Sequence, residues 1–161
     1  MLYKEYLNAA RKHEYTCDVI YEKIKKNDCS SCQKMCLMLN LYYLSGYIIE
    51  CIIKYAIYDL VGHKKEDDIK KLNKGGLSYD KHIKYHRFER YSEHLNRYLS
   101  VKIPLINDCS GIDREIIQLF SKWDSELRYE YYNNIKDVRH YENFYKYAKE
   151  IYKLIRLNTR G

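Results

Sequence analysis

Residues 41–57, LYYLSGYIIECIIKYAI, decide the fold of this chain. Gly46, Glu50 and Lys54 recur every four residues within this apolar run, and side chains four residues apart share one face of a helix. The small residue, the acid and the base therefore form one stripe of an otherwise apolar helix. Because a solvated ion pair does not need apolar neighbours on every side, we predict a central helix whose charges serve a specific contact.

The length and composition favour one helical domain over residues 1–161. A domain of about 150 residues buries roughly 68–70% of its unfolded surface, so it needs no disulfide or metal for stability. With 6 Gly and 1 Pro, the chain has too few turn residues for an all-β protein with many tight turns. Long segments without such residues favour an all-α fold.

Apolar residues recur with a helical period in five segments. Because short connections favour antiparallel neighbours, we predict an up-and-down bundle of four to five helices. Ser30 or Ser31 is a cap for the second helix, and Gly62 is its stop. Between the second and third segments, residues 64–80 are charged and contain Gly75-Gly76, so we predict a long, mobile loop there. The five segments are approximately residues 3–26, 31–60, 81–100, 116–127 and 135–156.

Charge and hydropathy indicate a cytoplasmic protein with acidic partners. The formal net charge is +7, which points to nucleic acid first, although the acidic residues are interspersed with the basic ones. The 20 tyrosines are expected mainly at core margins or interfaces, and a stacking platform for bases is the alternative. The N-terminus shows no signal peptide, and polar residues interrupt the longest apolar run, so we predict no membrane contact.

Three of the six cysteines form a cluster whose role the sequence leaves open. Cys29 and Cys32 have zinc or redox spacing, and Cys36 follows four residues later. No second Cys/His pair follows at the spacing of a zinc site, and His63 is the nearest histidine. Structural thiols at a helix start fit the pattern better, so we predict no metal and no cofactor.

Two segments together resemble a known family. The first is GYIIECIIK at residues 46–54, and the second is WDSELRY at residues 123–129. This order resembles the HEPN (higher eukaryotes and prokaryotes nucleotide-binding) family, in which a G-Y-x-x-E-x-x-x-K helix and a W-x-x-x-x-R-Y segment recur. A histidine lies between the two segments, either His86 or His94. The resemblance covers residues 37–157.

This resemblance implies a small helical bundle that commonly forms a homodimer. Many members bind or cleave RNA, as toxins paired with a nucleotidyltransferase-type antitoxin or within defence systems. Catalytic members carry an arginine followed by four to six residues and a histidine. Their histidine can shuttle a proton from the ribose 2′-hydroxyl, and their arginine can stabilise charge on the phosphate without a metal.

The chain departs from that catalytic pattern. After Arg128, the positions expected to hold the histidine carry Asn133 and Asn134, and an asparagine cannot accept a proton at neutral pH. We therefore treat these three residues as a degenerate catalytic motif and predict RNA or nucleotide binding without efficient catalysis. One alternative is an active metal-independent endoribonuclease toxin. Another is a protein-binding module partnered with a nucleotidyltransferase.

The charged stripe of the central helix has two possible roles. Glu50 and Lys54 can form an intrahelical ion pair. Alternatively, Glu50 can reach across the bundle to Arg128 in a bidentate, charge-assisted contact.

The segment at residues 81–100 supplies candidate phosphate contacts. On one helix, His82, His86 and His94 would lie roughly in line because they are spaced by multiples of four. We predict that this surface contacts phosphate groups rather than a metal. The candidate residues are His86, Arg87, Arg90 and His94.

Overall fold

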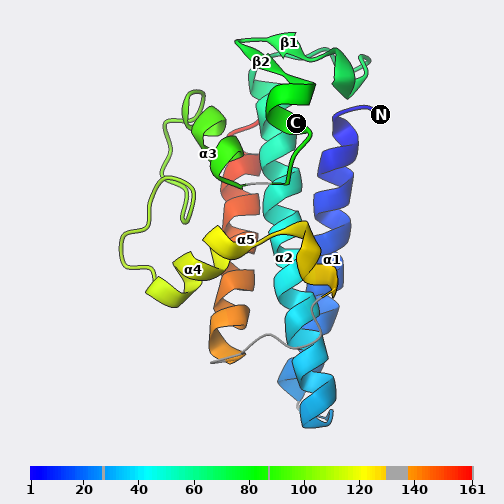
Figure 1. Ribbon diagram of the computed structural model, residues 1–161, viewed down its shortest axis with the longest axis vertical. Helices are drawn as coiled ribbons and strands as arrows, with labels where there is room; N and C mark the ends of the chain where they lie inside the picture. Colours follow the sequence, from blue (N-terminus) through cyan, green and yellow to red (C-terminus); the bar gives the residue numbers. More distant parts are fainter. Residues whose placement is uncertain (27, 87, 130–137, 161) are drawn as a thin grey trace.

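Three long helices lie side by side and form the body of the protein (Figure 1). The computed structural model describes residues 1–26, 28–86, 88–129 and 138–160, apart from the side chains of residues 89 and 90. Helix α2 (Ser31–Leu60) lies between α1 (Lys4–Lys26) and α5 (Val138–Leu157). The shorter helices α3 (Phe88–Asn96) and α4 (Arg114–Lys122) pack at the side of α2 and α5. The predicted all-α class and helical bundle are confirmed.

Local signals set both ends of α2. Ser30 forms a capping box with Gln33: its hydroxyl accepts from the Gln33 backbone N–H at 3.3 Å, and the Gln33 side chain accepts from the Ser30 backbone N–H at 2.9 Å. At the other end the helix finishes at Leu60, and Gly62 has a φ of +69°. A glycine adopts this left-handed conformation without steric penalty. Both predicted ends of the helix are therefore correct.

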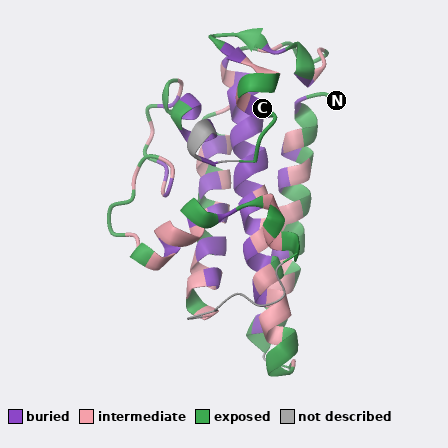
Figure 2. Ribbon diagram, in the orientation of Figure 1, coloured by how far each residue is buried: buried purple, intermediate pink, exposed green. Residues whose placement is uncertain are grey.

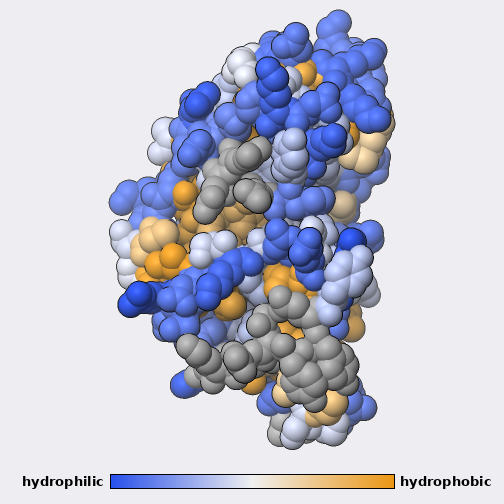
Figure 3. Space-filling model, viewed as in Figure 1, coloured by the Kyte–Doolittle hydropathy of each residue, from blue (hydrophilic) through white to orange (hydrophobic). Residues whose placement is uncertain are grey.

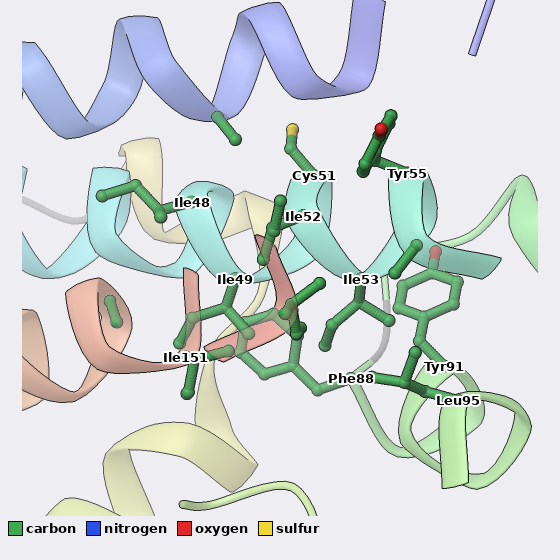
Figure 4. Packing of buried hydrophobic residues seen from close by; sticks show 14 of the residues in the cluster. Ile48, Ile49, Cys51, Ile52, Ile53, Tyr55, Phe88, Tyr91, Leu95 and Ile151 are labelled. Carbon is green, nitrogen blue, oxygen red and sulfur yellow. The ribbon is translucent and has the colours of Figure 1, made fainter. Parts of the chain in front are cut away.

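The core is built around the second half of α2, which is buried on all sides (Figure 2). In Figure 4, Cys51 and Tyr55 point toward α1, whereas Ile49 and Ile53 point to the opposite side, where Phe88, Tyr91, Leu95 and Ile151 lie. Within the described part of the chain, α2 alone is long and apolar enough to cross a membrane. However, 61% of its most apolar window is buried inside the protein, so packing accounts for its composition.

The long, mobile loop predicted at residues 64–80 contains short regular elements. This segment forms a short helix, η1 (Ile69–Lys71), then a two-stranded hairpin of β1 (Asn73–Lys74) and β2 (Leu77–Ser78), and then a π-helical turn, η2 (Tyr79–Ile83). Gly75 and Gly76 form the tight turn, with φ of +60° and +75°. Buried Ile69, Leu72 and Leu77 join the core, and this burial orders the segment.

The predicted third and fourth helices are shorter than expected. The π-helical turn η2 replaces the first part of the expected helix at residues 81–100, and α3 covers only Phe88–Asn96. Helix α4 ends at Lys122, because the backbone at Trp123 is extended. A separate short helix, η3 (Ser125–Tyr129), follows and crosses α2 near its middle (Figure 1).

Candidate functional site

Trp123 packs directly on Gly46, which brings the two family-like motifs together. A Cβ atom at Gly46 would lie only 1.9 Å from Nε1 of Trp123, so a glycine is required for this approach. The indole N–H donates to the Tyr43 carbonyl at 3.1 Å. Because Trp123 is fixed in this way, η3 is held against α2 beside Tyr47.

Half-buried Tyr47 is the centre of an aromatic cluster on this side of α2. Its ring centroid lies 5.1 Å from that of Trp123, in an edge-to-face arrangement, and 5.4 Å from that of His13. Burial raises the pKa of Tyr47, as does a hydrogen bond from the Tyr43 hydroxyl, whereas Arg128 opposes this rise. Tyr47 is therefore a neutral phenol within electrostatic reach of Arg128.

Glu50 and Lys54 form a buried ion pair in the core, as one of the two predicted roles requires. Lys54 Nζ lies 2.7 Å from Glu50 Oε1, and the two side chains are only 4% and 3% exposed. The ammonium group also lies over the ring of Tyr91, at 5.0 Å, and over that of Tyr6, at 5.6 Å. Because a buried carboxylate requires a partner, the ammonium compensates the charge of Glu50.

His86 links this buried pair to solvent. Its Nδ1 lies 2.9 Å from Glu50 Oε1 and 3.0 Å from Oε2, and its side chain is 46% exposed. An ionised carboxylate only accepts hydrogen bonds, so Nδ1 carries the proton and donates. The other ring nitrogen, Nε2, then has a free lone pair in the neutral ring, and no described residue hydrogen-bonds to it. The His86 ring also lies 6.3 Å from that of Tyr47.

The alternative pairing of Glu50 with Arg128 is wrong. Lys54 and His86 occupy the oxygens of Glu50, whereas Arg128 is exposed on η3. Its guanidinium stacks on the exposed ring of Tyr129, at 4.6 Å from the ring centroid. Helix α4 ends at Lys122, so Arg128 lies on η3 and not on the predicted fourth helix.

The predicted phosphate contacts separate into different environments. His86 is exposed, but His94 is buried and its ring meets that of His82 at 4.9 Å, so burial argues against a phosphate contact for His94. The predicted alignment of three histidines on one helix is wrong, because α3 begins only at Phe88. Arg87, the Arg90 side chain, Asn133 and Asn134 lie outside the described residues, so their roles stay predictions.

The cysteine cluster lines a pocket between the end of α1 and the start of α2. The pocket has a volume of about 420 Å³, and its wall includes Lys23, Cys29, Cys32 and Cys36. All six cysteines are free thiols. In the described ranges, no group of three His, Cys, Asp or Glu residues could hold a metal ion. The role of the cluster stays open.

Comparisons with protein-family models, with curated proteins and with solved structures found no match to this chain. Sequence reasoning identified Glu50, Lys54, His86 and Arg128 separately, but it missed the contact between Glu50 and His86. The available signal was an acid inside an apolar helix, which indicates that a partner exists without saying which residue it is.

Proposed function

We propose that this chain is an HEPN-like helical bundle that binds RNA or a nucleotide where η3 crosses α2. The binding surface, called the Arg128 face below, consists of Tyr47, His86, Arg128 and Tyr129. The observation that carries the proposal is the exposed stack of Arg128 on Tyr129, on the short helix η3 that packs against α2. An exposed cation and an exposed aromatic ring thus lie together on η3.

The chemistry of the Arg128 face suits single-stranded RNA. Unpaired bases stack on aromatic rings and guanidinium planes, and cationic side chains contact the phosphates. Tyr129 is 75% exposed, so its ring is open to a base. The face of the molecule seen in Figure 3 is largely hydrophilic, with small hydrophobic areas near its middle. The net charge of +7 adds a general attraction for phosphate.

The biological setting follows from the motif resemblance. It supports a homodimer in a toxin–antitoxin or defence system, with a nucleotidyltransferase-type protein as partner, and the charge and hydropathy pattern supports a cytoplasmic location. Sedimentation at micromolar concentration tests the homodimer, and a monomer there would contradict it.

Fluorescence anisotropy with a labelled single-stranded RNA tests the binding proposal. Arg128→Ala removes one cation from the face, so we expect weaker binding. The slope of log K against the logarithm of the salt concentration is expected to become less steep by about 0.7. Tyr129→Ala removes a stacking surface, which is worth about 1–3 kcal/mol per stacked base. Competition with a mononucleotide separates nucleotide binding from RNA binding.

Arg114→Ala is the matched control, because Arg114 is an exposed arginine in the first turn of α4. We expect this variant to bind RNA almost as tightly as the parent chain. An equal loss of affinity in the Arg114 and Arg128 variants would show that binding follows total charge and would contradict a specific site.

A further inference from the structure

Three of the six thiols lie in one pocket at the end of the bundle where α1 ends and α2 begins (Figure 1). Cys29, Cys32 and Cys36 all contribute to its wall. Its volume of about 420 Å³ is within the range of pockets that bind small molecules. Metal binding does not account for the arrangement, because no group of three His, Cys, Asp or Glu residues in the described part of the chain could hold a metal ion. The thiols are therefore candidates for covalent chemistry with a small molecule.

Cys32 is the most accessible of the three thiols. It lies in the first turn of α2 and is exposed, whereas Cys29 and Cys36 are half-buried. The thiolate of a cysteine is the group that attacks a disulfide, and the attack needs an open approach to the sulfur. Cys32 combines this approach with a pocket beside it, in which the rest of a disulfide-bearing molecule can lie.

An ion pair on the pocket wall suits a ligand that carries both charges. Lys23 Nζ lies 2.8 Å from Asp28 Oδ1, and the two side chains are 49% and 52% exposed, so both can also contact a ligand. The hydrogen bond to Asp28 raises the pKa of Lys23, and Cys29 contributes to this rise, so the ammonium group lies near the thiols. A carboxylate of the ligand can lie at Lys23 and an amino group at Asp28, while Leu37 adds an apolar part of the wall.

We propose that Cys32 is a modification site that forms a mixed disulfide with a low-molecular-weight peptide thiol of the glutathione class. The thiolate of Cys32 attacks one sulfur of the peptide disulfide, a new S–S bond forms, and the original S–S bond breaks. The leaving peptide thiolate takes up the proton that Cys32 released, so the products are the modified chain and one reduced peptide thiol. The peptide disulfide is the oxidant, and no further reactant is needed. The modification does not depend on RNA binding at the Arg128 face.

The rate at which each cysteine loses its free thiol in glutathione disulfide tests the proposal. Alkylation at timed intervals, followed by peptide mass spectrometry, gives this rate for the full chain. Cys109 is the matched control, because it is also exposed but does not line the pocket. The uncharged bis(2-hydroxyethyl) disulfide corrects for the intrinsic reactivity of the two thiols. We expect the ratio of the Cys32 rate to the Cys109 rate to be at least about tenfold larger with glutathione disulfide, because the pocket holds the peptide beside Cys32.

Two lysine variants test the contact with the charged pair. Lys23→Gln removes the cation of the pocket wall, so we expect the Cys32 rate in glutathione disulfide to fall by about twofold to fivefold, as for an exposed ion pair. Lys26→Gln is the control, because Lys26 is an exposed lysine in the same last turn of α1 but lies outside the pocket wall. We expect this variant to react at nearly the rate of the parent chain.

Three results would overturn the assignment. The same ratio of rates with both disulfides would show that the pocket does not recognise the peptide and that Cys32 reacts only because it is exposed. Loss of the free thiol at Cys36 before that at Cys32 would place the modification on a different cysteine. Equal rates in the two lysine variants would contradict the contact between Lys23 and a carboxylate of the peptide.

Discussion

Two buried polar regions lie beside α3, and they differ in how their polar atoms are satisfied. In the first, Glu50 has an ion pair with Lys54 and a hydrogen bond from His86, which reaches solvent. In the second, the buried ring of His94 meets that of His82, and neither His94 Nδ1 nor Ser92 Oγ has a hydrogen-bond partner among the described residues. The first region is charged and reaches solvent through the exposed ring of His86, whereas in the second region His94 and Ser92 are buried. Buried charges are thus compensated in the first region, whereas buried polar atoms are left unsatisfied in the second.

Glu50→Leu is expected to have the largest effect on stability. This substitution leaves the ammonium group of Lys54 buried without an anion, and breaking a buried ion pair in this way costs about 3–5 kcal/mol. Urea unfolding measures the loss. Glu50→Leu/Lys54→Met is the control, since apolar residues of similar volume are often as stable as the ion pair that they replace. A loss below about 1 kcal/mol in the single variant would show that the pair is not isolated from solvent.

Gly46→Ala is expected to have the next largest effect, because the new Cβ would overlap the indole of Trp123. Overpacking of this kind costs about 1–3 kcal/mol. Trp123 is the only tryptophan, so a red shift of the fluorescence emission would report its displacement from the core directly. Displacement would also move η3 and weaken RNA binding at the Arg128 face.

The substitution Trp123→Leu provides the background for a control on Gly46→Ala. In the Trp123→Leu background the clash is absent, so Gly46→Ala is expected to lower stability much less than it does in the parent chain. Equal losses in the two backgrounds would mean that helix α2 needs Gly46 for a reason other than contact with Trp123.

The sequence predicted the features that local interactions determine. Ser30, one of the two predicted caps, caps α2, and Gly62 terminates it, because these residues act on backbone groups a few positions away. The ion pair of Glu50 with Lys54 is local in the same sense, since both lie on one helix face.

Features that depend on tertiary contacts were missed. Glu50 and His86 are 36 residues apart in the sequence, and their contact depends on how the turn before α3 packs on α2. The end of α4 at Trp123 likewise depends on a space created by Gly46, 77 residues earlier. The hairpin at residues 73–78 was missed because its strands have only two residues each, too few for an alternating pattern.

Ser92→Ala tests the second buried polar region, that of His94 and Ser92. We expect the free energy of unfolding to increase, whereas Glu50→Leu is expected to decrease it. Among the described residues, the buried hydroxyl of Ser92 has no hydrogen-bond partner, so its removal also removes an unfavourable desolvation cost. A gain in the free energy of unfolding of about 1 kcal/mol is expected. Ser45→Ala is the control, because the buried hydroxyl of Ser45 donates to the Leu41 carbonyl at 2.6 Å. A loss of stability in Ser92→Ala as large as that in the control would show that Ser92 has a structural partner.

The pH dependence of stability provides the smallest effect. Burial lowers the pKa of His94 below its usual 6.5, nearby His82 and Arg97 lower it further, and Glu93 opposes them. Below pH 6.5 the unfolded chain therefore binds a proton that the folded chain resists, so stability decreases as the pH falls from 7 to 5. One such group contributes at most about 1.4 kcal/mol per pH unit. Urea unfolding across this pH range measures the effect, with His140→Gln as the control. The free energy of unfolding of His94→Gln is expected to fall less steeply with decreasing pH. An unchanged pH dependence in His94→Gln would mean that His94 is protonated as easily in the folded chain as in the unfolded one. The region around His94 would then be open to solvent, like that around Glu50.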